Sequence, residues 1–140
     1  MTSLEALSHE RCLELLRSQY LGRIGFVIDG QPQILPVNYA MLGSDVVFWT
    51  GAGSKLSAVD QNQAVAFEID GATTISHDGW SVLVVGAAHE IVDNKTREVV
   101  KALSLRPWVA GARDHVVRIT GQRISGRRIS HNCSLTRRAS

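Results

Sequence analysis

Residues 23–30 read Arg-Ile-Gly-Phe-Val-Ile-Asp-Gly, and the fold class can be argued outward from them. The first six are rich in branched and aromatic side chains, as strands are, and an Asp-Gly pair is a strong hairpin signal. We expect a second strand over residues 33–41 and, after a turn at 42–45, a third over residues 46–50. Short turns favour antiparallel neighbours, so this part of the chain predicts a three-stranded antiparallel meander.

Strands also dominate the remaining sequence. The further predicted strands span residues 64–69, 81–92 (bulged at Gly86), 115–120 and 124–129. The predicted helices span residues 4–18, 55–62 and 94–103, and Ser8 offers a second start for the first, while Ser54 and Asn94 are cap candidates for the others. Many strands without a strand–helix alternation predict a mainly β barrel or sandwich. One domain is expected over residues 1–130, followed by a polar basic tail over residues 131–140.

Charge is unevenly distributed along the 140 residues. Six arginines and no acidic residue lie between His115 and Ser140, which leaves nine basic against thirteen acidic side chains in residues 1–114. No apolar run approaches the roughly 18 residues of a membrane helix. The two cysteines are far apart and the five histidines lack a ligand spacing, so no metal site is expected. A cytoplasmic protein is the expectation, with no membrane partner.

A glycine-containing stretch, Trp49-Thr-Gly-Ala-Gly-Ser-Lys-Leu56, joins a strand to a helix start. Its backbone N–H groups at the helix start, together with the side chains of Ser54 and Lys55, suit a phosphate monoester. The stretch does not have the Walker spacing. On these residues alone, a phosphate site and an ordinary capped loop with a solvated lysine both remain open.

Three other segments each allow a binding role and a plain structural one. Pro32 and Pro36 place residues 32–39 at a sheet edge or bulge, where free backbone suits a planar heterocycle, although on the residues alone an irregular edge strand is the simpler explanation. Trp80, at the mouth of a strand that is apolar on both faces, is either a pocket wall or a core residue. In residues 123–129, Arg127 and Arg128 would face opposite ways, so one can reach an anion while the other is solvated.

Taken in order, these motifs resemble those of the flavin-binding split-barrel proteins of the pyridoxamine 5′-phosphate oxidase-like superfamily. The likeness is greatest to the short branch that includes nitroimidazole-resistance-type proteins. The segments that carry it are Gly22–Phe26, Pro36–Tyr39, Phe48–Leu56, Val65–Glu68, Gly79–Val84 and Ile124–Arg128.

The resemblance implies a six-stranded antiparallel split barrel that forms a homodimer with FMN sites at its interface. By position, it implies that the ribityl phosphate is held by Trp49, Thr50, Ser54 and Lys55. The isoalloxazine edge would follow Leu35, Pro36, Val37, Asn38 and Tyr39. It further implies that Trp80 and Ser81 reach the site from the partner subunit, and that Arg127 or Arg128 lies near the phosphate or the substrate.

Three functions follow as expectations. The first is an FMN-dependent oxidoreductase that transfers hydride to or from an unidentified small molecule, with Tyr39 and Ser81 as candidate proton donors or acceptors. The second is a reductase that uses the deazaflavin F420, whose anionic tail would need the C-terminal arginines. The third is a non-catalytic binder of flavin, haem or another tetrapyrrole. Nucleic acid is not an expected partner, because residues 1–114 are net acidic and the strands lack interleaved aromatic residues.

Overall fold

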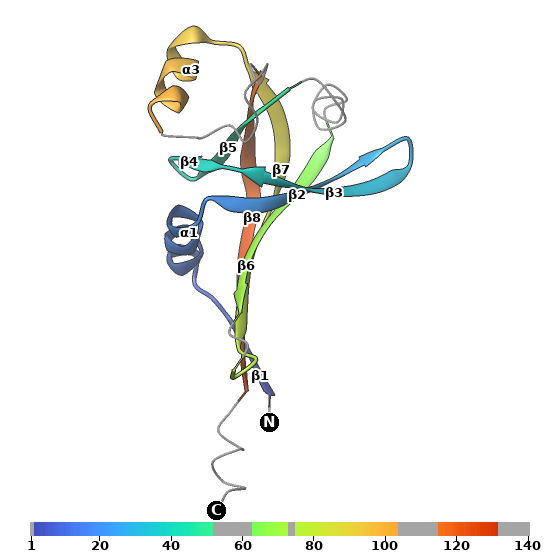
Figure 1. Ribbon diagram of the computed structural model, residues 1–140, viewed down its shortest axis with the longest axis vertical. Helices are drawn as coiled ribbons and strands as arrows, with labels where there is room; N and C mark the ends of the chain where they lie inside the picture. Colours follow the sequence, from blue (N-terminus) through green and yellow to red (C-terminus); the bar gives the residue numbers. More distant parts are fainter. Residues whose placement is uncertain (1, 52–62, 73–74, 104–114, 132–140) are drawn as a thin grey trace, which may run out of the picture.

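The computed structural model describes residues 2–51, 63–72, 75–103 and 115–131 (Figure 1). The strands are β1 (Thr2–Ala6), β2 (Leu21–Ile28), β3 (Gln31–Asn38), β4 (Ala40–Leu42), β5 (Asp45–Thr50), β6 (Ala64–Ala72), β7 (Gly79–Ile91) and β8 (His115–His131). The helices are α1 (His9–Ser18) and α3 (Asn94–Lys101). Within the described ranges, no helix is long and apolar enough to cross a membrane.

The eight strands form one antiparallel sheet that curves into a barrel. Their order is β3-β2-β6-β7-β8-β5-β4, and β1 pairs with β8. The strands at the two ends of this order, β3 and β4, are consecutive in the chain and separated by Tyr39 alone. Tyr39 therefore lies at the seam of the barrel, where its N–H donates to the carbonyl of Tyr20 at 3.0 Å. The predicted mainly β antiparallel barrel is confirmed, with eight strands in the described residues instead of six.

The first hairpin has the turn that its sequence predicts. Asp29 and Gly30 both adopt positive φ angles, +51° and +75°, as a type I′ turn requires. This turn sets the register of β2 against β3, which pairs Ile28 with Gln31 at the turn and Leu21 with Asn38 at the far end. The hairpin projects from the body of the barrel in Figure 1.

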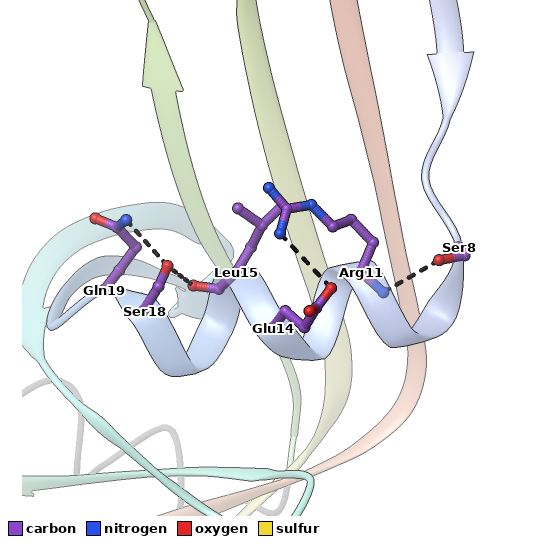
Figure 2. Close-up of polar contacts among 6 residues, drawn as sticks. All are labelled: Ser8, Arg11, Glu14, Leu15, Ser18 and Gln19. Carbon is purple, nitrogen blue, oxygen red and sulfur yellow. Dashed lines mark hydrogen bonds and ion pairs between the residues drawn. The ribbon is translucent and has the colours of Figure 1, made fainter.

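The N-terminal helix is shorter than predicted. It begins at His9 instead of residue 4, and its cap is the alternative start at Ser8, whose hydroxyl oxygen accepts a hydrogen bond from the Arg11 N–H at 3.1 Å (Figure 2). At the other end, the Ser18 hydroxyl donates to the Leu15 carbonyl at 2.7 Å. The residues before the cap form β1 against the end of β8, so strand pairing outweighs the weak helical spacing of Leu4 and Leu7.

Two predicted strands also differ from the observed ones. The strand predicted over residues 33–41 is broken at Tyr39, and its halves pair with β2 and β5, so the predicted meander is not continuous. The strands predicted over residues 115–120 and 124–129 are instead one strand, β8, which extends to His131. A strand with neighbours on both sides gains hydrogen bonds over its whole length, which the local sequence does not reveal.

The structure also tests the predicted bulge in β7 and the predicted cap of α3. The predicted bulge at Gly86 is confirmed by a register shift between Val85 and Gly86. The cap of α3 is Asp93 and not Asn94, because the Asp93 carboxylate accepts from the Thr96 N–H at 2.8 Å. The helix predicted over residues 55–62 and the loop predicted over residues 104–112 lie outside the described residues.

Apolar side chains pack in two clusters. The larger one fills the barrel, and its largest fully buried members are Phe48, Phe67, Leu16 and Ile24. The smaller one consists of Val47, Ile91, Val100 and Val116, and it attaches α3 to the sheet. Full burial of side chains of this size is worth roughly 1.5–3 kcal/mol each, so the clusters hold the strands that carry the candidate site.

Candidate functional site

The described candidate residues fall into two groups on different parts of the barrel. The seam group comprises residues 35–39 on and just after β3, and Trp49 and Thr50 at the end of β5. The second group comprises Trp80 and Ser81 at the start of β7 and Arg127 near the end of β8. The predicted phosphate ligands Ser54 and Lys55 lie outside the described residues.

In the seam group, β3 offers an accessible backbone edge. It pairs with β2 and stands last in the strand order, so its other edge has no ladder partner among the described residues. Pro36 is exposed, whereas Val37 is buried and Leu35 partly buried, so the side chains alternate between solvent and core. The sequence-based placement of these prolines on an edge strand is therefore confirmed.

The side chain of Tyr39 belongs to the core of the barrel. Its hydroxyl donates to the Leu16 carbonyl at 2.6 Å, and its ring meets Phe67 edge-on with centroids 4.8 Å apart. Burial raises the pKa of the Tyr39 phenol above its ordinary value. A buried phenol whose O–H group already donates a hydrogen bond is unsuited to proton transfer. We therefore assign the Tyr39 side chain a structural role in place of the predicted role as a proton donor or acceptor. A backbone contact at Tyr39 stays a prediction.

Trp49 and Thr50 end β5 beneath α3. Thr50 is 3% exposed, and its hydroxyl donates to the Gly51 carbonyl at 3.2 Å. The Trp49 ring packs on the smaller cluster, and the Arg97 guanidinium of α3 lies over it at 5.4 Å from the ring centroid. Such a contact fixes the indole by cation–π attraction. Both residues are thus held firmly at the point where the glycine-containing stretch begins.

A polar pair that sequence reasoning missed lies beside Thr50. His115 is the cross-strand neighbour of Thr50, and its Nδ1 lies 2.7 Å from Oε2 of Glu90 on β7. The two side chains are about one-third exposed. Because 25 residues separate them, the only signal that could have found the pair is the register of β7 against β8.

The second group lies at the opposite end of the same ladder and lines a surface hollow of about 290 Å³. We call this feature the hollow; its lining residues are Asp70, Gly71, Ala72, Gly79, Trp80, Ser81, Arg127 and Ile129. Three of them form a row across neighbouring strands, because Asp70 pairs with Ser81 and Ser81 with Arg127. The lining therefore includes three residues proposed from the sequence, Trp80, Ser81 and Arg127, and adds Asp70 and the glycines. The register turns the Trp80 side chain to the opposite face of the sheet from Ser81 and Arg127, where it packs on the larger cluster.

Glycines shape the hollow. A Cβ on Gly71 would lie 2.7 Å from the Trp80 indole nitrogen, so the indole lies directly against the Gly71 backbone. A Cβ on Gly79 would lie 3.1 Å from the carbonyl oxygen of Gly71. Side chains at these two positions would displace the indole or fill the space beside it, so the hollow depends on both glycines.

Charges around the hollow are not balanced. Asp70 forms an ion pair with Arg23 of β2, at 3.3 Å. Arg128 pairs with Glu5 at 3.3 Å, but Arg127 forms no ion pair within the described part of the chain. The rim therefore carries one guanidinium that forms no ion pair with any acidic side chain in the described ranges. In the described ranges, no cluster of His, Cys, Asp or Glu could hold a metal ion.

The two groups do not meet within one chain. Ser81 and Ile91 are ten residues apart on β7, which corresponds to about 33 Å of strand. Ser81 pairs with Arg127, whereas Ile91 pairs with Val116, the neighbour of Trp49. Figure 1 shows β7 and β8 running side by side over this length. Trp49 and Thr50 thus lie a ladder length from Ser81 and Arg127. Residues 35–39 are separated from the hollow across the sheet instead, because Pro36 pairs with Arg23, Arg23 with Glu68 and Glu68 with Leu83 of β7.

Comparison with known proteins adds three findings. A family model described as pyridoxamine 5′-phosphate oxidase matches residues 8–128. An uncharacterized protein of Mycobacterium tuberculosis is 34% identical over 128 residues, which are 88% of this chain and 84% of that protein. The solved structure of the FAD binding protein from Mycobacterium smegmatis is 36% identical with a TM-score of 0.76, covering 89% of this chain and 98% of that one.

A more distant structure has the same fold. The FAD-binding protein from Mesorhizobium loti is 24% identical, with a TM-score of 0.77, and the match covers 94% of this chain and all of that one. At this level of identity the likeness concerns the fold alone. The fold described above is therefore shared by a protein of quite different sequence.

Proposed function

The chain belongs to the pyridoxamine 5′-phosphate oxidase family, and from this premise we propose that it binds a flavin and acts as an oxidoreductase. The observation that carries the proposal is the 36% identity, over 89% of the chain, to a protein named for FAD binding. The structure offers a fitting cradle, because the open edge of β3 can face a planar ring and the hollow has a glycine floor. A bound flavin would supply hydride transfer at its N5, and this chain would supply orientation and electrostatics.

Each described residue has a distinct task under this proposal. The backbone of Leu35–Val37 would hydrogen-bond the edge of the isoalloxazine, since peptide groups on an open edge lack ladder partners. Trp49 and Thr50 would hold the start of the phosphate-binding stretch in place, which Arg97 supports by its contact with the Trp49 ring. Ser54 and Lys55 would bind the phosphate of FMN, the flavin that we propose. The reaction would take place in the cytoplasm.

We also propose that the site lies between two copies of the chain. Trp49 and Thr50 are a ladder length from the hollow in one chain, and a second copy related by two-fold symmetry would bring the hollow of one chain to the seam group of the other. A homodimer with two equivalent sites follows. Its residues at each site would be Leu35–Tyr39, Trp49, Thr50, Ser54 and Lys55 from one copy, and Trp80, Ser81 and Arg127 from the other.

Mixed dimers test this arrangement. Lys55→Ala weakens the seam side and Trp80→Leu the hollow side, so both homodimers should bind FMN much more weakly than the wild type. Co-expression should restore binding in about a quarter of all sites, because half of the dimers are mixed and each contains one intact site. Circular dichroism checks that both variants fold. Equal loss with no restoration, or a stable monomer in sedimentation, would contradict the shared site.

The identity of the cofactor is tested by the protein as purified. Bound FMN or FAD gives two visible absorption bands, F420 gives one band with strong fluorescence, and haem gives a Soret band; chromatography after heat release separates FMN from FAD. Lys55→Ala should weaken FMN binding about tenfold or more while leaving riboflavin nearly unaffected, because only FMN has the phosphate. A colourless protein that binds none of these in titrations would refute the proposal.

A further inference from the structure

The outer face of strands β3, β2, β6 and β7 carries an inference about how two copies of the chain meet. We infer that this face packs against the same face of a second copy, about a two-fold axis that runs between β2 and β6 along the strands. The inference rests on the proposed function, since it names the surface that would form the homodimer proposed above.

Alternating burial along the strands shows which side chains point outward. On β2, Ile24 and Phe26 are buried in the larger cluster, so Arg23 and Gly25 lie on the outer face. The same alternation holds on the other three strands. Their outward residues are Ile34 and Pro36 on β3, Ala66 and Glu68 on β6, and Leu83 and Val85 on β7.

Strand register arranges these eight residues in two rows that cross the four strands. The first row is Ile34, Gly25, Ala66 and Val85, and the second is Pro36, Arg23, Glu68 and Leu83. Each row has an apolar side chain at both ends. The middle of the first row is small, and the middle of the second has a base beside an acid.

This order makes the face complementary to itself. A two-fold rotation about the proposed axis places β3 of one copy on β7 of the other, and β2 on β6. Ile34 then meets the partner's Val85, and Arg23 meets the partner's Glu68. Apolar side chains therefore face apolar ones, and each base faces an acid.

The single chain leaves this face unsatisfied. Ile34 is 71% exposed, and exposed apolar side chains that gather on one face mark surfaces of association. Glu68 forms no ion pair with any basic side chain in the described part of the chain. Arg23 pairs with Asp70 at 3.3 Å, but both side chains are about half exposed, and a guanidinium has five N–H donors. The Arg23 guanidinium can therefore contact a second carboxylate from a partner.

The composition of β3 favours contact through its face over contact through its edge. Residues Gln31–Asn38 include no charged side chain, although exposed edge strands usually carry charges that prevent association. Pro32 and Pro36 lack N–H groups, so a strand of another molecule could not continue the ladder regularly along β3. A partner held by the side chains of the face agrees with both observations.

The same rotation agrees with the shared flavin site. Asn38 lies two residues from Pro36 on β3, and Ser81 lies two residues from Leu83 on β7, so both occupy the next row. The axis therefore brings the end of β3 to the partner's hollow. This is the arrangement in which residues 35–39 of one copy and Ser81 of the other contribute to one site.

The experiment reverses charges at the centre of the face. Arg23→Glu puts an acid opposite the partner's Glu68, and Glu68→Arg puts a base opposite the partner's Arg23. Each variant alone should therefore dimerise at least about tenfold more weakly than the wild type. Mixed in equal amounts, the two variants should form a heterodimer, because both contacts between its chains join an acid to a base.

Native mass spectrometry identifies the heterodimer, and analytical sedimentation measures the dissociation constants of the full-length proteins. Within each variant chain, positions 23 and 68 carry like charges before and after mixing. Only contacts between chains can therefore produce the recovery.

A second variant tests the apolar ends of the rows. Ile34→Glu should raise the dissociation constant of the dimer at least about hundredfold, because two-fold symmetry buries the unpaired charge twice. Val92→Glu is the matched control, since Val92 is apolar and 79% exposed but lies outside the two rows. It should leave the dissociation constant unchanged, and circular dichroism checks that both variants fold.

No recovery on mixing, an equal effect of Ile34→Glu and Val92→Glu, or a monomeric wild type would overturn the inference. Flavin binding is measured by absorbance on the same samples. A wild type that dimerises and binds flavin, with no recovery in the mixture, refutes this surface alone. A dimer that behaves as expected but binds no flavin refutes the proposed flavin function alone.

Discussion

The two ends of the β7–β8 ladder are built from the same two strands, yet they differ in how their polar side chains are paired and in whether a helix covers them. At the end near Ile91, polar side chains pair with one another: Glu90 Oε2 lies 2.7 Å from His115 Nδ1, and Arg118 forms an ion pair with Asp45 at 2.7 Å. This end is also covered by α3 through the smaller apolar cluster. At the other end, glycines leave a hollow, and Arg127 has no ionic partner in the described residues.

The difference teaches how one ladder can serve stability and binding at once. Groups that satisfy each other stabilise the fold and have little left for a ligand, whereas a group that stays uncompensated is available to one. The end covered by α3 should therefore respond to mutation mainly in stability. The end with the hollow should respond mainly in ligand binding.

The largest effect is expected in the middle of the ladder, where the bulge joins the two ends. A Cβ on Gly86 would lie 2.0 Å from the Thr120 carbonyl oxygen, so Gly86→Ala must separate β7 from β8 locally. We expect a loss of about 3 kcal/mol in the free energy of unfolding, measured by urea denaturation. Gly25→Ala is the control, because its Cβ would meet nothing closer than 3.8 Å and should change stability by less than about 1 kcal/mol. Similar losses of stability in both variants would show that the close approach of β7 to β8 at Gly86 does not limit the size of the side chain there.

The next largest effect compares the two ends of the ladder by replacing one arginine of β8 with glutamine at each end. Arg118→Gln removes both contacts with Asp45, from Nε at 2.8 Å and Nη2 at 2.7 Å, and should cost about 1 kcal/mol of stability. Arg127→Gln removes no ion pair among the residues that the structure describes, and it should stay within about 0.5 kcal/mol of the wild type. Urea denaturation at low and high salt checks both. A larger loss for Arg127→Gln than for Arg118→Gln would break the distinction between the ends.

The smallest effect concerns the cap of α3, at the covered end. Hydrogen bonds from the hydroxyl and N–H of Thr96 lower the pKa of the Asp93 carboxyl. A lowered folded-state pKa means that the contribution is fully present above the unfolded value, about 3.9, and is lost as the pH falls through the folded value. The difference in thermal midpoint between wild type and Asp93→Ala should thus be largest at neutral pH and shrink below about pH 4. Asp93→Asn should keep most of the cap and show no such dependence, and a constant difference across this range would contradict the mechanism.

Local signals predicted the parts of the fold that local chemistry determines. The Asp29-Gly30 turn, the bulge at Gly86 and the edge position of Pro36 each follow from the backbone preferences of one or two residues. The β1 strand could not be found this way, because Leu4 and Leu7 fit a helical spacing and only β8, more than 120 residues away, makes the segment a strand.

The residues of the candidate site could likewise be predicted in part from the sequence, whereas their arrangement in space could not. Trp80, Ser81 and Arg127 were each proposed from the sequence, but that they line one hollow follows from strand register. Asp70 gave no signal, since an acidic residue at the end of a strand is ordinary until its neighbours are known. The core position of the Tyr39 hydroxyl was equally hidden, because its acceptor belongs to α1 and not to a neighbouring strand.

The length of β8 has a consequence for how the chain is made. This strand pairs with β1, β5 and β7, and it follows every other described element in the sequence. Until the ribosome has released residues 115–131, no described strand pairs the β4–β5 hairpin with the β3-β2-β6-β7 sheet, although Tyr39 joins β3 to β4 along the chain. Until then Val46 and Phe48 lack their cross-strand partners Ile119 and Val117, and exposed apolar side chains of this kind favour aggregation of folding intermediates. We therefore expect the barrel to close only after β8 has been synthesised.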